Sequence, residues 1–386
     1  MPVIDQIAEF ADELTTIRRD LHEHPELGFQ EHRTAGIVAA KLSEWGIEVT
    51  RGIGGTGVVG VLKGTRPGKT IGLRADMDAL PIHEQTNLPW ASKTPGVMHA
   101  CGHDGHTTML LGAARYLAGN PDFAGTAVFI FQPAEEGLGG ARAMIADGLF
   151  DRFPCDEIYG MHNAPQDDPD EVGIKKGPAM AGSDFFDIRI SGCGSHGARP
   201  EDSRDPVVIA SSLVQQLQSI VARNVPPTSP AVVSVTKIHA GDAYNVIPET
   251  AELGGTIRFF DTSVGEMISA RLRALCEGTA KGYGVEIAVD IRNTFDVLVN
   301  DADLSDAVLD AAAAVVGAGK AGLKQDLVMG SEDFADMLRV VPGAYCTVGH
   351  AGSVPVHNPG YVLDDAILPV GASIYANLVT SRGAAA

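Results

Sequence analysis

The sequence predicts an α/β protein with two domains, and three observations support this prediction. The chain has 386 residues, which is more than one compact core usually holds. Short apolar runs typical of buried strands are followed repeatedly by acidic residues or histidines, and then by segments with helical spacing. Residues 183–292 have the predicted element order β-α-β-β-α-β of a ferredoxin-like motif. We therefore expect one domain made of residues 1–182 and 293–386, interrupted by a second domain at 183–292.

The N-terminal part of the first domain is predicted to be helical. Apolar side chains recur at helical spacing over residues 4–21, and Pro25 is expected to end this helix. Thr34–Trp45 has the pattern of a second amphipathic helix. Runs rich in β-forming residues follow at Gly57–Leu62 and Thr70–Arg74, so the sheet is expected to begin there.

Polar clusters directly follow the predicted strands of the first domain. They are Asp76-Met77-Asp78 after residues 70–74, Glu135-Glu136 after residues 126–131, and His162-Asn163 after residues 157–161. His357 comes much later, after a predicted strand at 343–348. In open α/β sheets, binding sites lie at the carboxyl ends of the strands. We therefore expect these side chains to meet at one edge of the sheet.

The second domain contains four predicted strands and two predicted helices. The strands are Phe185–Ile190, Ala231–His239, Glu249–Phe259 and Val285–Ile291, and the helices are Pro206–Ala222 and Val264–Tyr283. This set can fold as a small domain of its own. Because His357 lies beyond it in the sequence, the second domain interrupts the first.

The composition and charge of the chain argue against some classes of binding partner and some cellular locations. The chain has 29 Lys and Arg against 49 Asp and Glu, a net charge of −20, which argues against nucleic acid or an anionic membrane surface. No apolar stretch approaches membrane-spanning length, and the N-terminus has no apolar segment of signal-peptide length. The five cysteines are scattered and odd in number, unlike a disulfide framework. We therefore expect a cytoplasmic protein.

The segment Met98–His106 has the composition of a metal-binding loop. It contains three histidines, a cysteine and an aspartate between glycines. Cys101 and His103 are two residues apart, so on a tight loop both side chains can reach one point. A thiolate and a neutral imidazole suit a borderline divalent metal such as zinc, manganese or nickel. The alternative is a polar turn whose histidines are solvated.

The other clusters supply what a hydrolytic site with two metals needs. The candidate ligands are Cys101, His103, Glu136, His162 and His357. Glu135, adjacent to Glu136, can supply a base, because a neighbouring cation lowers the pKa of water towards ~7 and a carboxylate can then take its proton. An acidic pair is usually a solvated surface feature, but one that follows an apolar strand and Gln-Pro is a rarer context.

These motifs, in this order, resemble the dinuclear metallopeptidases of aminoacylase/carboxypeptidase type. The resemblance is to the amidohydrolase branch, which includes hippurate hydrolase, N-acyl-L-amino acid amidohydrolase and the indole-acetyl-amino-acid hydrolases. It covers nearly the whole chain and rests on His22–Gly28, Arg74–Pro81, Met98–His106, Phe131–Gly137, Gly160–Asn163, Ser195–Pro200, Asn245–Pro248, Gly330–Phe334 and His357–Pro359. It implies a mixed-sheet, zinc-exopeptidase-like catalytic domain and an inserted lid or dimerisation domain.

The resemblance also implies roles for single residues. The five candidate ligands would bind metal, and Glu135 would act as the general base. In the inserted domain, His196 would polarise the substrate carbonyl. Asn245 and Arg258 would hold the substrate carboxylate, Arg258 through the two-pronged geometry that suits a guanidinium. For these last two residues, ordinary hydrogen bonding at strand ends is the alternative.

One feature departs from the wider family and leaves the group that bridges the metals open. Peptidases of that wider family carry a His-x-Asp strand end and a bridging aspartate. Here Asp76-Met77-Asp78 has no histidine at that place, and a Cys-Gly-His loop stands in for it. We predict that Asp78 orients a ligand imidazole, as groups behind metal ligands commonly do. A helix N-cap is its alternative role.

The sequence therefore predicts a metal-dependent amidohydrolase that cleaves the acyl amide of small N-acyl-L-amino acids, such as N-acetyl or N-benzoyl (hippurate) compounds. The expected cofactors are two divalent metal ions per subunit, manganese or zinc, with nickel or cobalt as alternatives. A homodimer or a tetramer formed through the lid domain is expected. Alternatives are a dipeptidase, an N-acetyl-diaminopimelate deacetylase, a metal- or amino-acid-binding module without turnover, and a structural protein stabilised by zinc.

Overall fold

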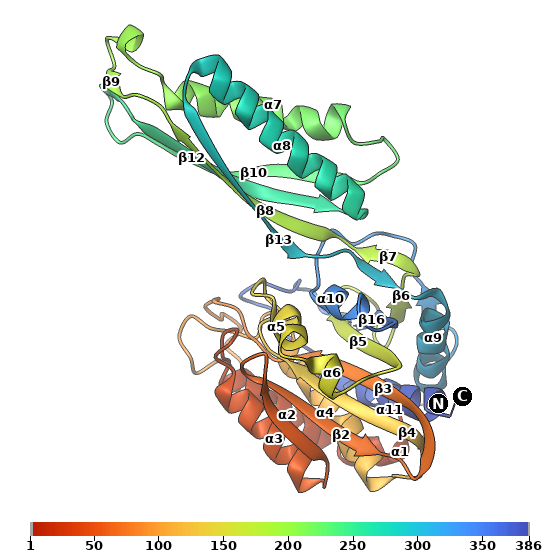
Figure 1. Ribbon diagram of the computed structural model, residues 1–386. Helices are drawn as coiled ribbons and strands as arrows, with labels where there is room; N and C mark the ends of the chain where they lie inside the picture. The colour runs from red at the N-terminus through yellow and green to blue at the C-terminus, as the bar shows by residue number, and fades with distance from the viewer. Residues whose placement is uncertain (1–2, 385–386) are drawn as a thin grey trace. The chain divides into compact units, whose positions relative to one another are not determined.

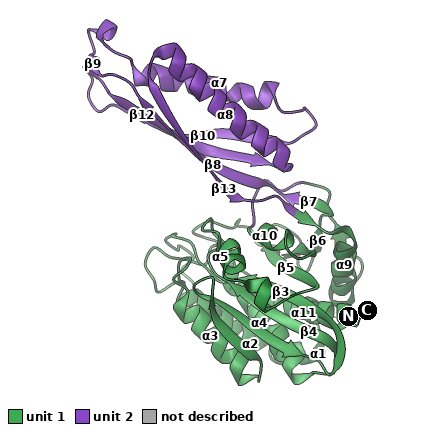
Figure 2. Ribbon diagram, in the orientation of Figure 1, with its two compact units in different colours: residues 1–177, 299–326, 333–386 green, residues 178–298, 327–332 purple. Residues whose placement is uncertain are grey.

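The computed structural model describes residues 3–384 and divides into two compact units (Figure 2). Unit 1 comprises the described residues up to Gly177, Val299–Asp326, and the described residues from Asp333 onward. Unit 2 comprises Pro178–Leu298 together with Leu327–Glu332. The sequence had placed the inserted domain at 183–292 and had not separated residues 327–332 from the first domain.

Unit 1 is built on an eight-stranded mixed sheet with strand order β1-β2-β4-β3-β5-β16-β6-β15. The strands are β1 (Glu48–Ile53), β2 (Gly57–Lys63), β3 (Arg66–Asp76), β4 (Ala124–Gln132), β5 (Glu157–Ala164), β6 (Val172–Ile174), β15 (Ala321–Leu323) and β16 (Gly343–Gly349). The central strands β4, β3, β5 and β16 are parallel, whereas β1, β2 and β6 pair antiparallel with their neighbours β2, β4 and β16. The predicted mixed-sheet α/β class is therefore confirmed.

Helices of unit 1 cover the sheet (Figure 1). They are α1 (Asp5–Glu9), α2 (Ala11–Glu23), α3 (His32–Glu44), α4 (His103–Gly119), α5 (Gly140–Ala146), α6 (Leu149–Arg152), α9 (Ala302–Val316), α10 (Phe334–Leu338) and α11 (Leu368–Arg382), with a 3₁₀ turn η2 (Asp365–Ile367). The single helix predicted at residues 4–21 is interrupted at Phe10, which lies between α1 and α2. None of the described helices is long and apolar enough to cross a membrane.

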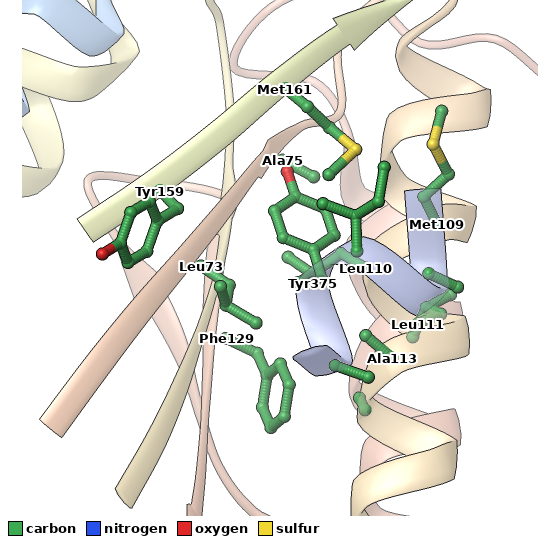
Figure 3. Close-up of a cluster of buried hydrophobic side chains, with 14 of the residues drawn as sticks. Leu73, Ala75, Met109, Leu110, Leu111, Ala113, Phe129, Tyr159, Met161 and Tyr375 are labelled. Carbon is green, nitrogen blue, oxygen red and sulfur yellow. The ribbon is translucent and has the colours of Figure 1, made fainter. Parts of the chain in front are cut away.

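The core of unit 1 lies between the parallel strands and the helices α4 and α11. Leu73 and Ala75 of β3 are buried there, and Figure 3 shows them facing Met109 of α4 and Tyr375 of α11. Because successive strand residues point to opposite faces, Arg74 lies on the other face of β3, where it bonds Asp333 at the start of α10. The parallel strands are thus buried on both faces, and the side chains that follow them gather at their carboxyl ends.

Unit 2 has the element order predicted from the sequence. Its elements are β8 (Gly182–Ser191), α7 (Pro206–Arg223), β10 (Ala231–Ala240), β12 (Thr250–Phe259), α8 (Thr262–Tyr283) and β13 (Glu286–Phe295). The sheet order β10-β12-β8-β13, with antiparallel neighbours throughout, is that of a ferredoxin-like βαββαβ unit. Smaller elements of unit 2 are β9 (Ser195–His196) paired with β11 (Val246–Ile247) and the 3₁₀ turn η1 (Pro200–Asp202), and the short strands β7 (Gly177–Met180) and β14 (Leu298–Asn300) fall where the chain passes from one unit to the other.

Local sequence explains how unit 2 covers its sheet. Phe186, Ile188 and Ile190 alternate along β8 and are buried, so one face of the sheet is apolar. The helix α7 begins at Pro206, and the carboxylate of Asp205 caps it by accepting from the backbone N–H of Val207. The apolar face of α7 packs with that of α8 over the buried side of the sheet.

Candidate metal centre

The Met98–His106 loop delivers two donor side chains from one tight turn. The helix α4 begins at His103, and Gly102 before it adopts the left-handed conformation with φ 91°. A Cβ at position 102 would lie 2.4 Å from Nδ2 of Asn163, so both the conformation and the space require glycine. The turn brings Sγ of Cys101 to 3.3 Å from Nε2 of His162, which comes from the carboxyl end of β5.

The imidazole of His103 is held by Asp78. Its Nδ1 lies 2.9 Å from the backbone oxygen of Asp78 and 3.2 Å from that residue's Oδ1, so Nδ1 donates and Nε2 faces the cluster. Burial opposes the charged form of His103, but the negative charges of Asp76 and Cys101 outweigh it and raise the pKa of His103 well above its ordinary value. The N-cap of α4 is Gly102, not Asp78.

A strained turn after β4 directs both glutamates towards His103. Ala134 has a positive φ of 54°, and its N–H donates to Oε1 of the buried Glu31 at 2.8 Å. The N–H of Glu136 donates to Oδ2 of Asp78 at 3.0 Å. As a result Oε2 of Glu135 and Oε1 of Glu136 lie 3.9 Å and 4.0 Å from Nε2 of His103.

His162 and His357 complete the cluster, and their surroundings shift their pKa values in opposite directions. Nδ1 of His162 donates to the backbone oxygen of Asn163 at 2.6 Å, and burial lowers the pKa of His162 to about 3. A neutral imidazole of this kind is the form that binds metal. His357 is half-exposed, and its Nε2 lies 3.3 Å from Oε1 of Glu136. Hydrogen bonds to Cys101 and Glu136 raise the pKa of His357 to about 10.

These six side chains form overlapping groups whose donor atoms could share a metal ion. The groups are Cys101/His103/His162, Cys101/Glu136/His357 and His103/Glu135/Glu136, and within each group the donor atoms lie within 4.8 Å of one another. Nε2 of His103 is buried without a hydrogen-bond partner among the described residues. Buried polar atoms are normally paired, so this cluster fits a bound cation. Its thiolate, imidazole and carboxylate donors suit zinc or manganese.

The three predicted site residues of unit 2 do not all lie together. His196 on β9 is exposed, and its Nδ1 accepts from the N–H of Ala198 at 3.0 Å. Asn245 lies beside it, because its backbone oxygen accepts from the N–H of Gly197 at 2.8 Å. Arg258 is near the far end of β12, half-buried against Ser183 and with its Nη1 2.7 Å from Oγ1 of Thr256. The structure therefore separates Arg258 from Asn245, with which the sequence had grouped it.

Comparison with known proteins identifies the family. Residues 72–381 match the sequence model of Peptidase family M20/M25/M40. The chain belongs to this family. It is 44% identical to a hippurate hydrolase from Campylobacter jejuni, with 98% of both chains covered, and 40% identical to an N-acetylcysteine deacetylase from Bacillus subtilis, with 96% of both covered. It is also similar to a solved Bacillus subtilis structure, YXEP, described as a dinuclear metal binding peptidase from M20 family, with TM-score 0.83, 38% identity, and 97% and 98% coverage. The resemblance predicted from the motifs is confirmed.

In this M20 chain, sequence reasoning missed a buried layer behind the cluster. Nδ1 of His106 donates to Oδ1 of Asp76 at 2.6 Å, and Nε2 of His106 accepts from the N–H of Asn163 at 3.0 Å. Both ring nitrogens are thus engaged within the protein. Burial opposes ionisation of Asp76, but the charges of His103 and Arg74 and the hydrogen bond from His106 hold its pKa well below the ordinary value. The sequence did show Asp76 at the end of a predicted strand. It did not indicate that His106 would be the hydrogen-bond partner of Asp76.

Proposed function

We propose that this M20 chain hydrolyses the acyl amide bond of N-acyl-L-amino acids with the help of two divalent metal ions per subunit. The observation that carries the proposal is the placement of Glu135 beside a full donor set rather than at the surface. A structural metal site closes all ligand positions and needs no adjacent carboxylate. The names of two close relatives, a hippurate hydrolase and an N-acetylcysteine deacetylase, denote enzymes that act on such amides.

We assign the two metal positions from the overlapping groups. His103 and His162 would hold one ion and Glu136 and His357 the other, and Cys101 belongs to both groups of donors. The ions, manganese or zinc, supply positive charge that polarises the amide carbonyl and makes a water molecule acidic.

The five cysteines are free. A reducing compartment keeps cysteines such as Cys101 from forming disulfides, and this supports a cytoplasmic location.

Glu135 would move the proton in this reaction. Its carboxylate takes a proton from the attacking water and returns it to the amine that leaves as the amide breaks. Only 6% of Glu135 is exposed, so its proton is shielded from exchange with bulk water. Asp78 supports the step indirectly, because it holds both the His103 imidazole and the backbone of Glu136.

A substrate panel tests the proposed function. We expect hydrolysis of N-acetyl-, N-benzoyl- and indole-acetyl-amino acids by metal-loaded enzyme, with manganese and zinc each supplied, and loss of activity after chelation. Dipeptides and amino-acid amides serve as comparison substrates, because a dipeptide carries a free α-amino group on its acyl part and an amino-acid amide has no N-acyl group. Turnover of dipeptides alone would replace the proposal with a dipeptidase, and turnover of none of these compounds by metal-loaded protein would remove it.

We further propose that His196 serves the active site of a partner subunit in a homodimer. Thr250 of β12 pairs with Ser191, close to β9, whereas Arg258 lies eight residues further along the same strand. At the rise of an extended strand this is about 27 Å. His196 and Arg258 of one chain therefore cannot hold the same small substrate. In a two-fold dimer, His196 of one chain would instead reach the substrate bound in the partner subunit, so His196 and Arg258 of the same chain need not bind the same molecule.

Complementation in mixed dimers tests this arrangement. The Glu135→Ala and His196→Ala chains are each expected to be inactive, and refolding them together should restore part of the wild-type activity. In a mixed dimer one site then has an intact Glu135 from one chain and an intact His196 from the other. If His196 acted within its own chain, each site would keep one defect. Absence of recovery, with mixed dimers demonstrated, would contradict the proposal and leave the metal chemistry unaffected.

A further inference from the structure

Asn163 is a buried amide whose hydrogen-bonding capacity is fully used. It lies near the carboxyl end of β5 and is 3% exposed. Its Nδ2 donates to the backbone oxygen of Cys101 at 2.6 Å and to Nε2 of His106 at 3.1 Å. Its Oδ1 accepts from the hydroxyl of Tyr361 at 2.7 Å and from Nε2 of His350 at 3.3 Å. A primary amide has two donor hydrogens and two acceptor lone pairs, and each has a partner here, with the single lone pair of Nε2 of His106 shared between the amide and the backbone N–H of Asn163.

The surrounding groups allow only one orientation of this amide. Nδ1 of His106 donates to Asp76, so Nε2 of His106 can only accept, and it must face the amide nitrogen. Burial and the charge of Asp104 raise the pKa of Tyr361 well above its ordinary value, so its hydroxyl keeps its proton and donates to the amide oxygen. A flipped amide would place donor against donor and acceptor against acceptor.

Asn163 fixes two of the proposed ligands, one with its side chain and one with its backbone. The side chain holds the carbonyl of Cys101, and the backbone oxygen of Asn163 accepts from Nδ1 of His162 and turns Nε2 of His162 towards Sγ of Cys101. Gly102 lies directly against the amide, where a Cβ would be 2.4 Å from Nδ2. The contact between Asn163 and the ligand loop is therefore close, and a side chain at position 102 would displace the amide.

We propose that Asn163 is a positioning residue of the metal centre. Its side chain holds the Cys101 loop and its backbone oxygen orients His162 before metal arrives, so that little reorganisation accompanies binding. This inference rests on the proposed function, because it takes Cys101 and His162 as ligands. Groups behind metal ligands commonly change metal affinity by about 10- to 100-fold when they are replaced. No activity is assigned to Asn163 itself, because it lies behind the ligands and is buried.

The test compares two buried asparagines of unit 1. Asn163→Leu removes the amide that holds the ligand loop. Asn300→Leu is the matched control: Asn300 is 2% exposed, and its amide bonds the backbone of Lys175 and Tyr345 rather than any of the six cluster residues. Apo-protein is titrated with cobalt against a competing chelator, and the thiolate-to-cobalt charge-transfer band is recorded. We expect Asn163→Leu to bind cobalt about 10- to 100-fold more weakly, with a shifted or weakened band, and Asn300→Leu to match the wild type.

A milder variant covers the case in which Asn163→Leu fails to fold. Tyr361→Phe keeps the buried ring and removes only the hydroxyl that orients the amide, so a smaller loss of cobalt affinity in the same direction is expected. Wild-type affinity in Asn163→Leu, or in a folded Tyr361→Phe when Asn163→Leu does not fold, would overturn the inference. Equal losses in Asn163→Leu and Asn300→Leu would do the same. A wild-type protein that binds cobalt without a thiolate band would instead overturn the assignment of Cys101, and thus the proposed metal site itself.

Discussion

Replacing Glu135 with glutamine is expected to lower kcat by about 10²- to 10⁴-fold, the usual contribution of a general base. Glutamine has almost the same shape but cannot take a proton, so packing in the turn after β4 is preserved. The Ala134 contact with Glu31 and the backbone bond from Glu136 to Asp78 do not involve the replaced group. Metal content, measured on purified protein after dialysis, should therefore stay at the wild-type level.

Glu136→Gln is the matched control, because it makes the same chemical change one residue away. Oε1 of Glu136 is buried and lies 3.3 Å from Nε2 of His357. We expect this variant to lose metal first and activity as a consequence, so that excess metal restores part of the rate. Near-normal kcat in fully loaded Glu135→Gln enzyme would rule out Glu135 as the base.

Much of this architecture could be predicted because it rests on local patterns. The apolar strands that precede Asp76, Glu135 and His162 are short, and the parallel strands β3, β4 and β5 bring their carboxyl ends to one edge of the sheet. In unit 2 the alternation along the strands and the helical spacing of Pro206–Ala222 were enough to give the element order. These signals depend on side chains that are near each other in the sequence.

The rest depends on contacts between distant segments, which no local pattern encodes. The sequence could not indicate that His106 would bond Asp76 while His103, three residues earlier, faces the cluster, because the direction of the α4 axis decides this. It could not place Asn163 against Cys101 and Tyr361, which are remote in the chain. The separation of Asn245 from Arg258 follows from strand register in unit 2, which was also not accessible.

The largest effect on stability is expected at Arg74, which is buried on β3 with two carboxylates. Its Nη1 lies 2.6 Å from Oδ2 of Asp76 and its Nη2 lies 3.0 Å from Oδ1 of Asp333, and all three side chains are at most 1% exposed. Nε of Arg74 donates to Oε1 of Gln132 at 2.8 Å. The guanidinium thus ties the carboxyl end of β3 to the start of α10, and its charge offsets the two buried carboxylates.

Arg74→Met should therefore lower the free energy of unfolding of unit 1 by about 3–5 kcal/mol, because Asp76 and Asp333 lose their shared cation in a dry environment. Arg66→Met is the matched control on the same strand: Arg66 is 59% exposed and pairs with Asp122 in solvent, so a loss below about 1 kcal/mol is expected. Both tryptophans of the chain, Trp45 and Trp90, lie in unit 1, so tryptophan fluorescence of metal-free protein in urea, excited selectively over tyrosine, reports this unit alone.

A double variant separates lost charge balance from lost packing. If the unpaired carboxylates cause the loss, Arg74→Met combined with Asp333→Asn should be more stable than Arg74→Met alone, because one buried charge is removed with the cation. If packing of the long side chain were the cause, the second substitution would only add to the damage, since the amide cannot replace the volume of arginine. An Arg74→Met midpoint equal to that of Arg66→Met would contradict the account altogether, and would mean that water reaches this network in the folded protein.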